Sequence, residues 1–398
     1  MTGLTRMKTV GLLLVAFAAL GACGGKIPFQ TGAVFGEARL LEGVCAKDAQ
    51  AVALEGDRLY VGGRGFVAVY DVGTDAARPK LLGQTDDIAT VRQMAVQDGL
   101  VYSVTRSEGL WITDCRDPKS PTTVGHLPLT LNSTGVDVAG NVCFVGGSRS
   151  GIGFVDVSDP TRPQLVAIVR REPVESQSVA YRNGILYSGE WGGRGVTAWD
   201  CRDMADIRRT CYHPLVSNGD GVCPQGKWLY ACTGWSSADK EPDARPHPGQ
   251  MGLTVFDLAD PSQPKEVGRV DFEYCKASGL DMWIPRASGT GKLVFCAQNL
   301  GGLYAVDVTD KAHPKVVDRW VKSNGKGETL ALRRAEGHAS LLVASVAVGN
   351  GVVYVAGPGG LGAWAIPAKG ATPDRIDRGT PPVNATVRPA PPTVPEGL

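Results

Sequence analysis

The 398-residue sequence lacks the residue clusters that most metal, redox and catalytic sites need. Its five histidines are far apart, and it contains no Cys-x-x-Cys, His-x-His or His-Glu-x-x-His motif, which excludes the metal and redox sites recognised by such spacing. No Gly-x-Ser-x-Gly stands at a strand-to-helix elbow, and neither glycine-rich stretch, 192–195 or 357–360, opens a helix. We therefore predict no metal, no cofactor and no recognisable catalytic residue.

Excess charge of either sign is also missing. The 41 Lys and Arg residues nearly balance the 40 Asp and Glu residues, for a net charge of +1, so nucleic acid is not an expected partner. Only 20% of the residues are charged, whereas glycine (52) and proline (26) are abundant. This composition is typical of a β protein with many turns.

What the sequence does contain is a repeat, seen most clearly at 151–163, where a short strand ends in Asp156 and an Asp-Pro-x-x-Pro turn follows. Copies aligned on the strand-end aspartate give Asp71, Asp114, Asp156, Asp200, Asp257 and Asp307, with Ile366 in the seventh place. The first four aspartates stand 43, 42 and 44 residues apart, and the later gaps carry insertions. Such a period of about 40–45 residues fits one four-stranded propeller blade.

The third copy shows how one blade is built. Residues 135–138, 142–145, 152–157 and 164–169 are its expected strands A to D, with a Gly140-Asn141 hairpin turn and a turn at 159–163. Seven A-B-C sets recur but only six D strands follow, and residues 36–43 can supply the missing one. We predict an all-β fold, a seven-bladed β-propeller of four-stranded antiparallel blades whose last blade is closed by the N-terminal strand.

The motif Val155-Asp156-Val157-Ser158-Asp159-Pro160, with a close copy at 306–310, resembles the LVIVD-repeat family of secreted bacterial and archaeal proteins. The copy at 201–204, Cys-Arg-Asp-Met, has lost both prolines. The resemblance implies a β-propeller, and it brings no catalytic motif that could be carried over. The strand-end aspartates recur once per blade, as turn-forming residues do, so we interpret them as structural.

The N-terminus is typical of a secretion signal, with Arg6 and Lys8 before an apolar run from Val10 to Leu20. Leu20-Gly21-Ala22-Cys23 resembles the lipobox of bacterial lipoproteins, which implies cleavage before Cys23 and lipidation of its thiol; an ordinary signal peptide is the alternative. No Asp follows Cys23, so in a two-membrane bacterium the sorting rule of lipoproteins implies the outer membrane. The expected organisation is a signal peptide (1–22), lipidated Cys and tether (23–35), propeller (36–367) and a Pro-rich disordered or extended tail (368–398).

Nine cysteines remain after Cys23, and export would permit disulfides. Cys201 and Cys211 flank the blade-four turn without prolines, so a bridge there would replace the lost turn chemistry. Cys223 with Cys232 across a hairpin, and Cys275 with Cys296, are further candidates.

Propellers bind ligands where strand A of each blade begins, near the axis, and these segments are polar and differ between blades. We predict a ligand or partner site at this axis mouth, and the following residues are its candidates: Arg92, Gln93, Glu175, Gln177, Asp220 and Lys276. The insertions at 235–250, 283–291 and 322–341 form a second candidate surface.

The leading hypothesis is a lipid-anchored, monomeric, non-enzymatic module of the cell envelope that binds an envelope protein or a small molecule. The alternative is a carbohydrate-active hydrolase or lyase, with Glu175 or Asp220 as acid or base and Arg92 or Lys276 as electrophilic support. A purely structural spacer is the third interpretation.

Overall fold

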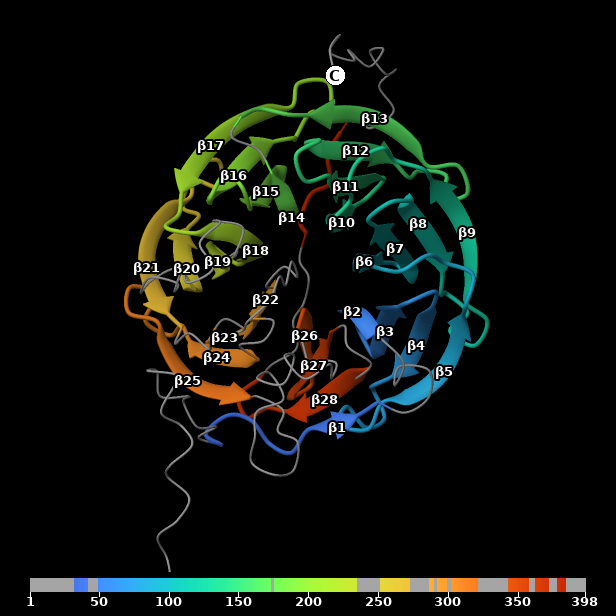
Figure 1. The fold of residues 1–398 in the computed structure, drawn as a ribbon, viewed down its shortest axis with the longest axis horizontal. Coiled ribbons are helices and arrows are strands. Elements are labelled where there is room, and N and C mark those ends of the chain that lie inside the picture. The colour runs from blue at the N-terminus through green and yellow to red at the C-terminus, as the bar shows by residue number, and fades with distance from the viewer. Residues whose placement is uncertain are drawn as a thin grey trace, which may run out of the picture.

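The computed structural model describes residues 32–41, 49–172, 175–234, 251–272, 286–289, 292–298, 302–320, 343–357, 362–371 and 378–383. Their strands form seven four-stranded antiparallel sheets arranged in a ring (Figure 1). Within these ranges no helix is long and apolar enough to cross a membrane. The predicted all-β, seven-bladed propeller is thus confirmed.

The first four blades follow the chain without interruption. Blade one contains β2 (Ala49–Glu55), β3 (Arg58–Gly63), β4 (Val67–Asp71) and β5 (Lys80–Thr85). Blade two contains β6 (Gln93–Gln97), β7 (Leu100–Thr105), β8 (Gly109–Asp114) and β9 (Thr122–Leu127). Blade three contains β10 (Gly135–Ala139), β11 (Val142–Gly146), β12 (Ile152–Asp156) and β13 (Gln164–Val169). Blade four contains β14 (Ser176–Arg182), β15 (Ile185–Glu190), β16 (Gly195–Asp200) and β17 (Arg208–Pro214).

Blades five to seven complete the ring. Blade five contains β18 (Asn218–Gln225), β19 (Trp228–Gly234), β20 (Gly252–Asp257) and β21 (Lys265–Asp271). Blade six contains β22 (Arg286–Gly289), β23 (Leu293–Ala297), β24 (Leu303–Asp307) and β25 (Lys315–Trp320). Blade seven contains β26 (Ser345–Gly349), β27 (Val352–Ala356), β28 (Ala363–Pro367) and, from the N-terminal part of the chain, β1 (Arg39–Leu40).

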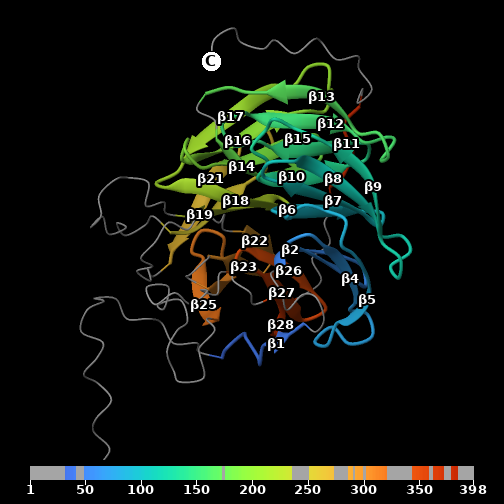
Figure 2. The ribbon, with the colours of Figure 1, turned by 45° about the vertical axis from the view of Figure 1, so that its right-hand side comes forward.

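The N-terminal strand closes the ring, as predicted. Arg39 of β1 pairs with Ala365 of β28 in antiparallel register, and Figures 1 and 2 both place the two strands side by side. The preceding segment is tied to blade six, because Asp318 Oδ2 accepts hydrogen bonds from Val34 N (2.9 Å) and Phe35 N (3.0 Å). One short segment therefore joins the last two blades.

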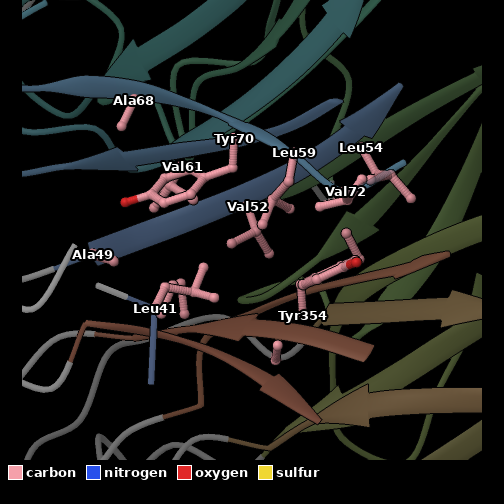
Figure 3. Close-up of a cluster of buried hydrophobic side chains, with 14 of the residues drawn as sticks. Leu41, Ala49, Val52, Leu54, Leu59, Val61, Ala68, Tyr70, Val72 and Tyr354 are labelled. Carbon is pink, nitrogen blue, oxygen red and sulfur yellow. The ribbon is translucent and has the colours of Figure 1, made fainter. Parts of the chain in front are cut away.

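Each strand B carries one buried aromatic residue in an equivalent place, and these rings fill the space between blades. They are Tyr60, Tyr102, Phe144, Tyr187, Tyr230, Phe295 and Tyr354. At the joint between blades one and seven, Tyr354 packs in a cluster with Val52, Leu59, Tyr70 and Leu41 (Figure 3). The regular geometry of the ring thus comes from one apolar contact that is repeated around the axis.

The strand-end aspartates stabilise turns, as interpreted from the sequence. Each accepts a hydrogen bond from the backbone N–H two residues later, at 2.8–3.4 Å, and the donors are Gly73, Arg116, Ser158, Arg202, Ala259 and Thr309. A second aspartate in the same turn repeats the pattern. In blade three, hydrogen bonds from Thr161 and Arg162 lower the pKa of Asp159 to about 2.

Blade six differs from the sequence-based placement. Its strand A is β22, which pairs with β23 through Arg286 and Ala297, so 286–289 is not part of an insertion. Residues 275–278, expected at the start of this strand, precede it by several residues and lie outside the described residues. Pattern alone could not place this strand because Arg-Ala-Ser-Gly lacks alternating apolar residues.

Part of the expected tail is attached to the propeller. Ala368 bridges to Phe35, and residues 378–383 run along blades three and four, seen as the red segment beside β10 and β14 in Figure 1. Val383 forms a parallel bridge with Asp203. The sequence predicted a disordered or extended tail, and it did not predict these contacts. Residues 384–398 lie outside the described residues.

Candidate functional site

The predicted axis mouth is best defined at the joint of blades three and four, where strand β14 begins. The carboxylate of Glu175 accepts hydrogen bonds from Ser148 Oγ and Arg149 Nε, each at 3.4 Å, and Gln177 Nε2 donates to the same Ser148 Oγ (3.4 Å). Glu175 and Gln177 are both buried, whereas the Arg149 side chain is 79% exposed. The Glu175 carboxylate thus holds an arginine at the rim with its guanidinium open to solvent.

Glycine makes room for this carboxylate. A Cβ atom on Gly192 would overlap Glu175 Oε2. Gly192 belongs to the turn after β15, and Glu175 O accepts a hydrogen bond from the N–H of Trp191 in that turn (2.9 Å). The turn and the start of β14 therefore form one close-packed unit.

A second carboxyl group, Glu190, is buried behind this surface. It accepts hydrogen bonds from Ser188 Oγ (2.6 Å), Thr197 Oγ1 (2.9 Å), Ser176 Oγ (3.1 Å) and Glu175 N (2.8 Å). Burial raises its pKa above 4.5, and these hydrogen bonds oppose that rise. Because the donors come from β14, β15 and β16, Glu190 ties three strands of blade four together.

The mouth continues to blade five. The Ser178 hydroxyl donates to the backbone oxygen of Asp220, and the Asp220 side chain is buried. In the amide orientation that satisfies both groups, Asn218 accepts from Trp191 Nε1 (2.8 Å) and donates to Trp191 O (2.9 Å). Polar contacts thus connect blades three, four and five along one arc of the mouth.

The six predicted mouth residues divide into three groups. Glu175, Gln177 and Asp220 lie along this arc and are buried. Gln93, in blade two, accepts a hydrogen bond from Val136 N of blade three (3.2 Å), so its amide oxygen serves a joint between blades. Arg92 adjoins Gln93, and its N–H donates to Val104 O (2.7 Å), while Lys276 lies outside the described residues. A ligand for these side chains remains a prediction.

Sequence reasoning missed Ser148, Arg149 and Glu190. A signal for Glu190 exists, because it stands three residues after the strand-B aromatic, where blades one to three have Gly63, Thr105 and Gly147. A carboxyl group at a position that small residues occupy in blades one to three indicates a local network. Nothing in the sequence pairs Ser148 with Glu175, since they meet only when blades three and four pack.

Neither predicted disulfide on the four candidate cysteines is present. Cys201 is buried with its Sγ directed at Gly184 O (3.4 Å), and Cys211 lies opposite Ala198, beyond the reach of Cys201. Cys223 faces Tyr230 while Cys232 faces Gly221, so the two are diagonal neighbours in the ladder, about 7–8 Å apart between Cα atoms and too far for a bridge. Cys275 lies outside the described residues.

Metal ligands do not gather anywhere in the described ranges: no group of three or more His, Cys, Asp or Glu side chains could hold an ion there. Three of the histidines each contact one protein oxygen, of Glu108, Glu266 or Asp310. At the mouth, the buried carboxyl groups of Glu175 and Glu190 are engaged with neighbouring side chains, and the Arg149 side chain is exposed. The insertions at 235–250 and 322–341 lie outside the described residues.

Comparison with known proteins supports the repeat and the fold. The family model of the LVIVD repeat matches residues 132–170 and 249–272. No curated protein matches the sequence. Similar folds include the WD40 repeats of RRP9 (9% identity, TM-score 0.57, covering 83% of this chain and 97% of that chain).

Two other solved structures share the architecture. A functionally unknown protein from Desulfotomaculum acetoxidans has 10% identity and a TM-score of 0.56, over 69% of this chain and 85% of that one. The computationally designed Ika8 protein has 12% identity and a TM-score of 0.52, over 83% of this chain and 98% of that one. At these identities the likeness concerns the fold alone.

Proposed function

We propose that this seven-bladed propeller with LVIVD repeats is a non-enzymatic binding scaffold of the bacterial cell envelope, anchored through a lipid on Cys23. The observation that carries the binding role is the arc of buried polar groups from Ser148 to Asp220, in which Glu175 holds the exposed side chain of Arg149 at the mouth. A preorganised arginine loses little side-chain freedom on binding, which makes it a suitable anchor for a protein partner.

The anchoring part rests on the lipobox-like Leu20-Gly21-Ala22-Cys23. We expect the wild-type chain to partition into the membrane fraction and Cys23→Ser to lose both the lipid and the partition. Mass spectrometry of the N-terminal peptide and fractionation measure the two effects. A Cys23→Ser chain that keeps the wild-type lipid mass would refute the anchor.

The binding part is tested by in-cell crosslinking of the lipidated protein followed by mass spectrometry. We expect Arg149→Ala to reduce recovery of the specific partner about tenfold or more, on the scale of a hot-spot arginine. Arg162→Ala is the matched control, because Arg162 is equally exposed (82%) but lies on a C–D turn away from the mouth. Equal recovery with both variants would place binding elsewhere.

A further inference from the structure

Strand A of blade three departs from the other blades at Asp137. The residue opposite each strand-B aromatic is small in the remaining six blades: Ala53, Ala95, Ala180, Cys223, Ser288 and Ala347. In blade three this place is taken by Asp137, opposite Phe144. A carboxylate in a buried ring of small residues requires partners, since an uncompensated charge there is costly.

The tail supplies the partner. Arg378 Nε donates to Asp137 Oδ1 (2.8 Å), and Arg378 Nη1 donates to Val96 O (3.1 Å). Both charged side chains are only 12% exposed. The other Asp137 oxygen accepts a hydrogen bond from Tyr181 N (2.8 Å), so blade four also positions the carboxylate.

A second departure lies at the end of the same strand. Glu55 and Gln97, the last residues of strand A in blades one and two, each reach the A–B turn of the next blade and accept from its first N–H, at 2.8 and 2.9 Å. In blade three the equivalent residue is Ala139, which cannot do so. The corresponding turn N–H, on Asn183, instead donates to Arg378 O (2.9 Å). A backbone carbonyl of the tail thus replaces a missing side chain.

The third departure is the blade-four turn, which lacks both prolines, whereas the turns of blades one and six keep the second one, Pro79 and Pro314. Blades two, three and five have Pro118, Pro160 and Pro261 after the second turn aspartate, whereas blade four has Met204. Proline has no N–H to donate. Met204 N donates to Val383 O (3.2 Å) and Val383 N donates to Arg202 O (3.0 Å), so the blade-four turn forms a strand-like edge for the tail.

The tail fits this strip through its own sequence. Gly379 has φ +62°, and a Cβ there would overlap the Asn183 side chain, whose oxygen accepts from Thr380 N (3.2 Å). Pro381 packs on Gly140, where an added Cβ would come within 2.7 Å of it. Thr380 O accepts a hydrogen bond from the Tyr181 hydroxyl. Arginine, glycine and an extended backbone are therefore the features that the strip recognises.

We propose that the joint of blades three and four, at the end of the axis opposite the mouth, is a peptide-binding site for an extended Arg-Gly-x-Pro-Pro-Val segment. Residues 378–383 occupy it within the chain, and a second peptide with the same sequence displaces them. Main-chain hydrogen bonds supply affinity and the buried arginine supplies specificity, as in strand addition. This site goes beyond the scaffold function at the mouth and is independent of it.

The test uses the full chain with its own segment expelled by Arg378→Ala and Gly379→Ala. A fluorescent peptide of residues 376–385 is titrated and followed by anisotropy. We expect the peptide to bind the expelled variant saturably. Binding to the wild-type chain should be at least tenfold weaker, because the tethered segment competes for the site. A peptide with Arg378→Ala should bind the expelled variant at least tenfold more weakly than the peptide with arginine.

Two changes in the expelled background locate the site. Asp137→Asn keeps the shape but removes the charge, and Met204→Pro introduces the residue of blades two, three and five while removing the N–H. Each should weaken binding at least tenfold, whereas Asp206→Asn, at an exposed aspartate of the same turn, should not. Circular dichroism confirms folding.

Absence of binding to a folded expelled variant, or equal binding of the arginine and alanine peptides, overturns the proposal. The peptide comparison needs only the expelled chain, so it remains decisive if Asp137→Asn fails to fold.

Discussion

Glu190 is a carboxyl group with 0% exposure, surrounded by hydroxyl groups and one backbone N–H rather than by a cation. Its raised pKa means that the folded protein resists ionisation more than the unfolded chain does. The contribution of Glu190 to stability is therefore complete at low pH and decreases as the pH rises above 4.5.

We predict that Glu190→Gln gains stability relative to wild type as the pH rises from 4.5 towards neutrality. Glutamine keeps an acceptor for Glu175 N and the hydroxyls but carries no charge. Urea unfolding of both proteins across this pH range gives the difference in the free energy of unfolding.

Two comparisons make this measurement decisive. Glu190→Ala should lose stability at every pH, by about 1–3 kcal/mol, because it leaves buried donors without an acceptor. Glu172→Gln, at an exposed carboxylate, should follow wild type. A pH-independent difference between Glu190→Gln and wild type would show that Glu190 does not ionise differently on folding.

Between neighbouring blades, glycine in strand D meets the C–D turn of the next blade. A Cβ on Gly83, Gly125 or Gly268 would press on the backbone oxygen of Pro118, Pro160 or Lys311 respectively. Hydrogen bonds to the aspartates of these turns hold their backbone, so the turns resist displacement. The same contact recurs in three joints, which explains how the outer strands lock to one another.

We predict that Gly125→Ala lowers the free energy of unfolding by about 1–3 kcal/mol, because the added methyl group overlaps the Pro160 carbonyl oxygen. Denaturant unfolding measures the change. Thr122→Ala, on the same strand and exposed, should stay within about 0.5 kcal/mol of wild type. A Gly125→Ala protein as stable as this control would mean that the joint adapts.

The whole ring depends on its closure. The segment around Phe35 and β1 ties the N-terminal part of the described chain to blades six and seven, through Asp318, the Phe295 ring (5.9 Å between centroids) and β28. The pairing of β1 with β28 gives blade seven its fourth, outer strand, so all seven sheets have four strands.

We predict that Asp318→Ala lowers the free energy of unfolding by about 1–3 kcal/mol for each N–H, of Val34 and of Phe35, that loses its acceptor. The pairing that closes the ring should then open before the other blades unfold. Hydrogen exchange should show faster exchange in β1 and β28 than in β10 to β12. Asp206→Ala, at an exposed aspartate, serves as the comparison. Uniform protection in Asp318→Ala would mean that the closure does not need this carboxylate.

The sequence by itself determined the number of blades, the strand order within a blade, the turn role of the aspartates and the closure by the N-terminal strand. The reason is physical: each blade is a local unit of adjacent hairpins, so its pattern of apolar residues and turn residues appears directly in the sequence. The sequence did not predict strand A of blade six, because Arg286–Gly289 has no such pattern.

Only the tertiary structure decided which side chains meet between blades. Glu175 reaches Ser148, and Arg378 reaches Asp137 across 241 positions of the sequence, through contacts that no local pattern encodes. The loss of proline at Met204 was visible in the sequence and was interpreted as a disulfide site. The fold shows that it frees an N–H for Val383, because the tail returns to that turn.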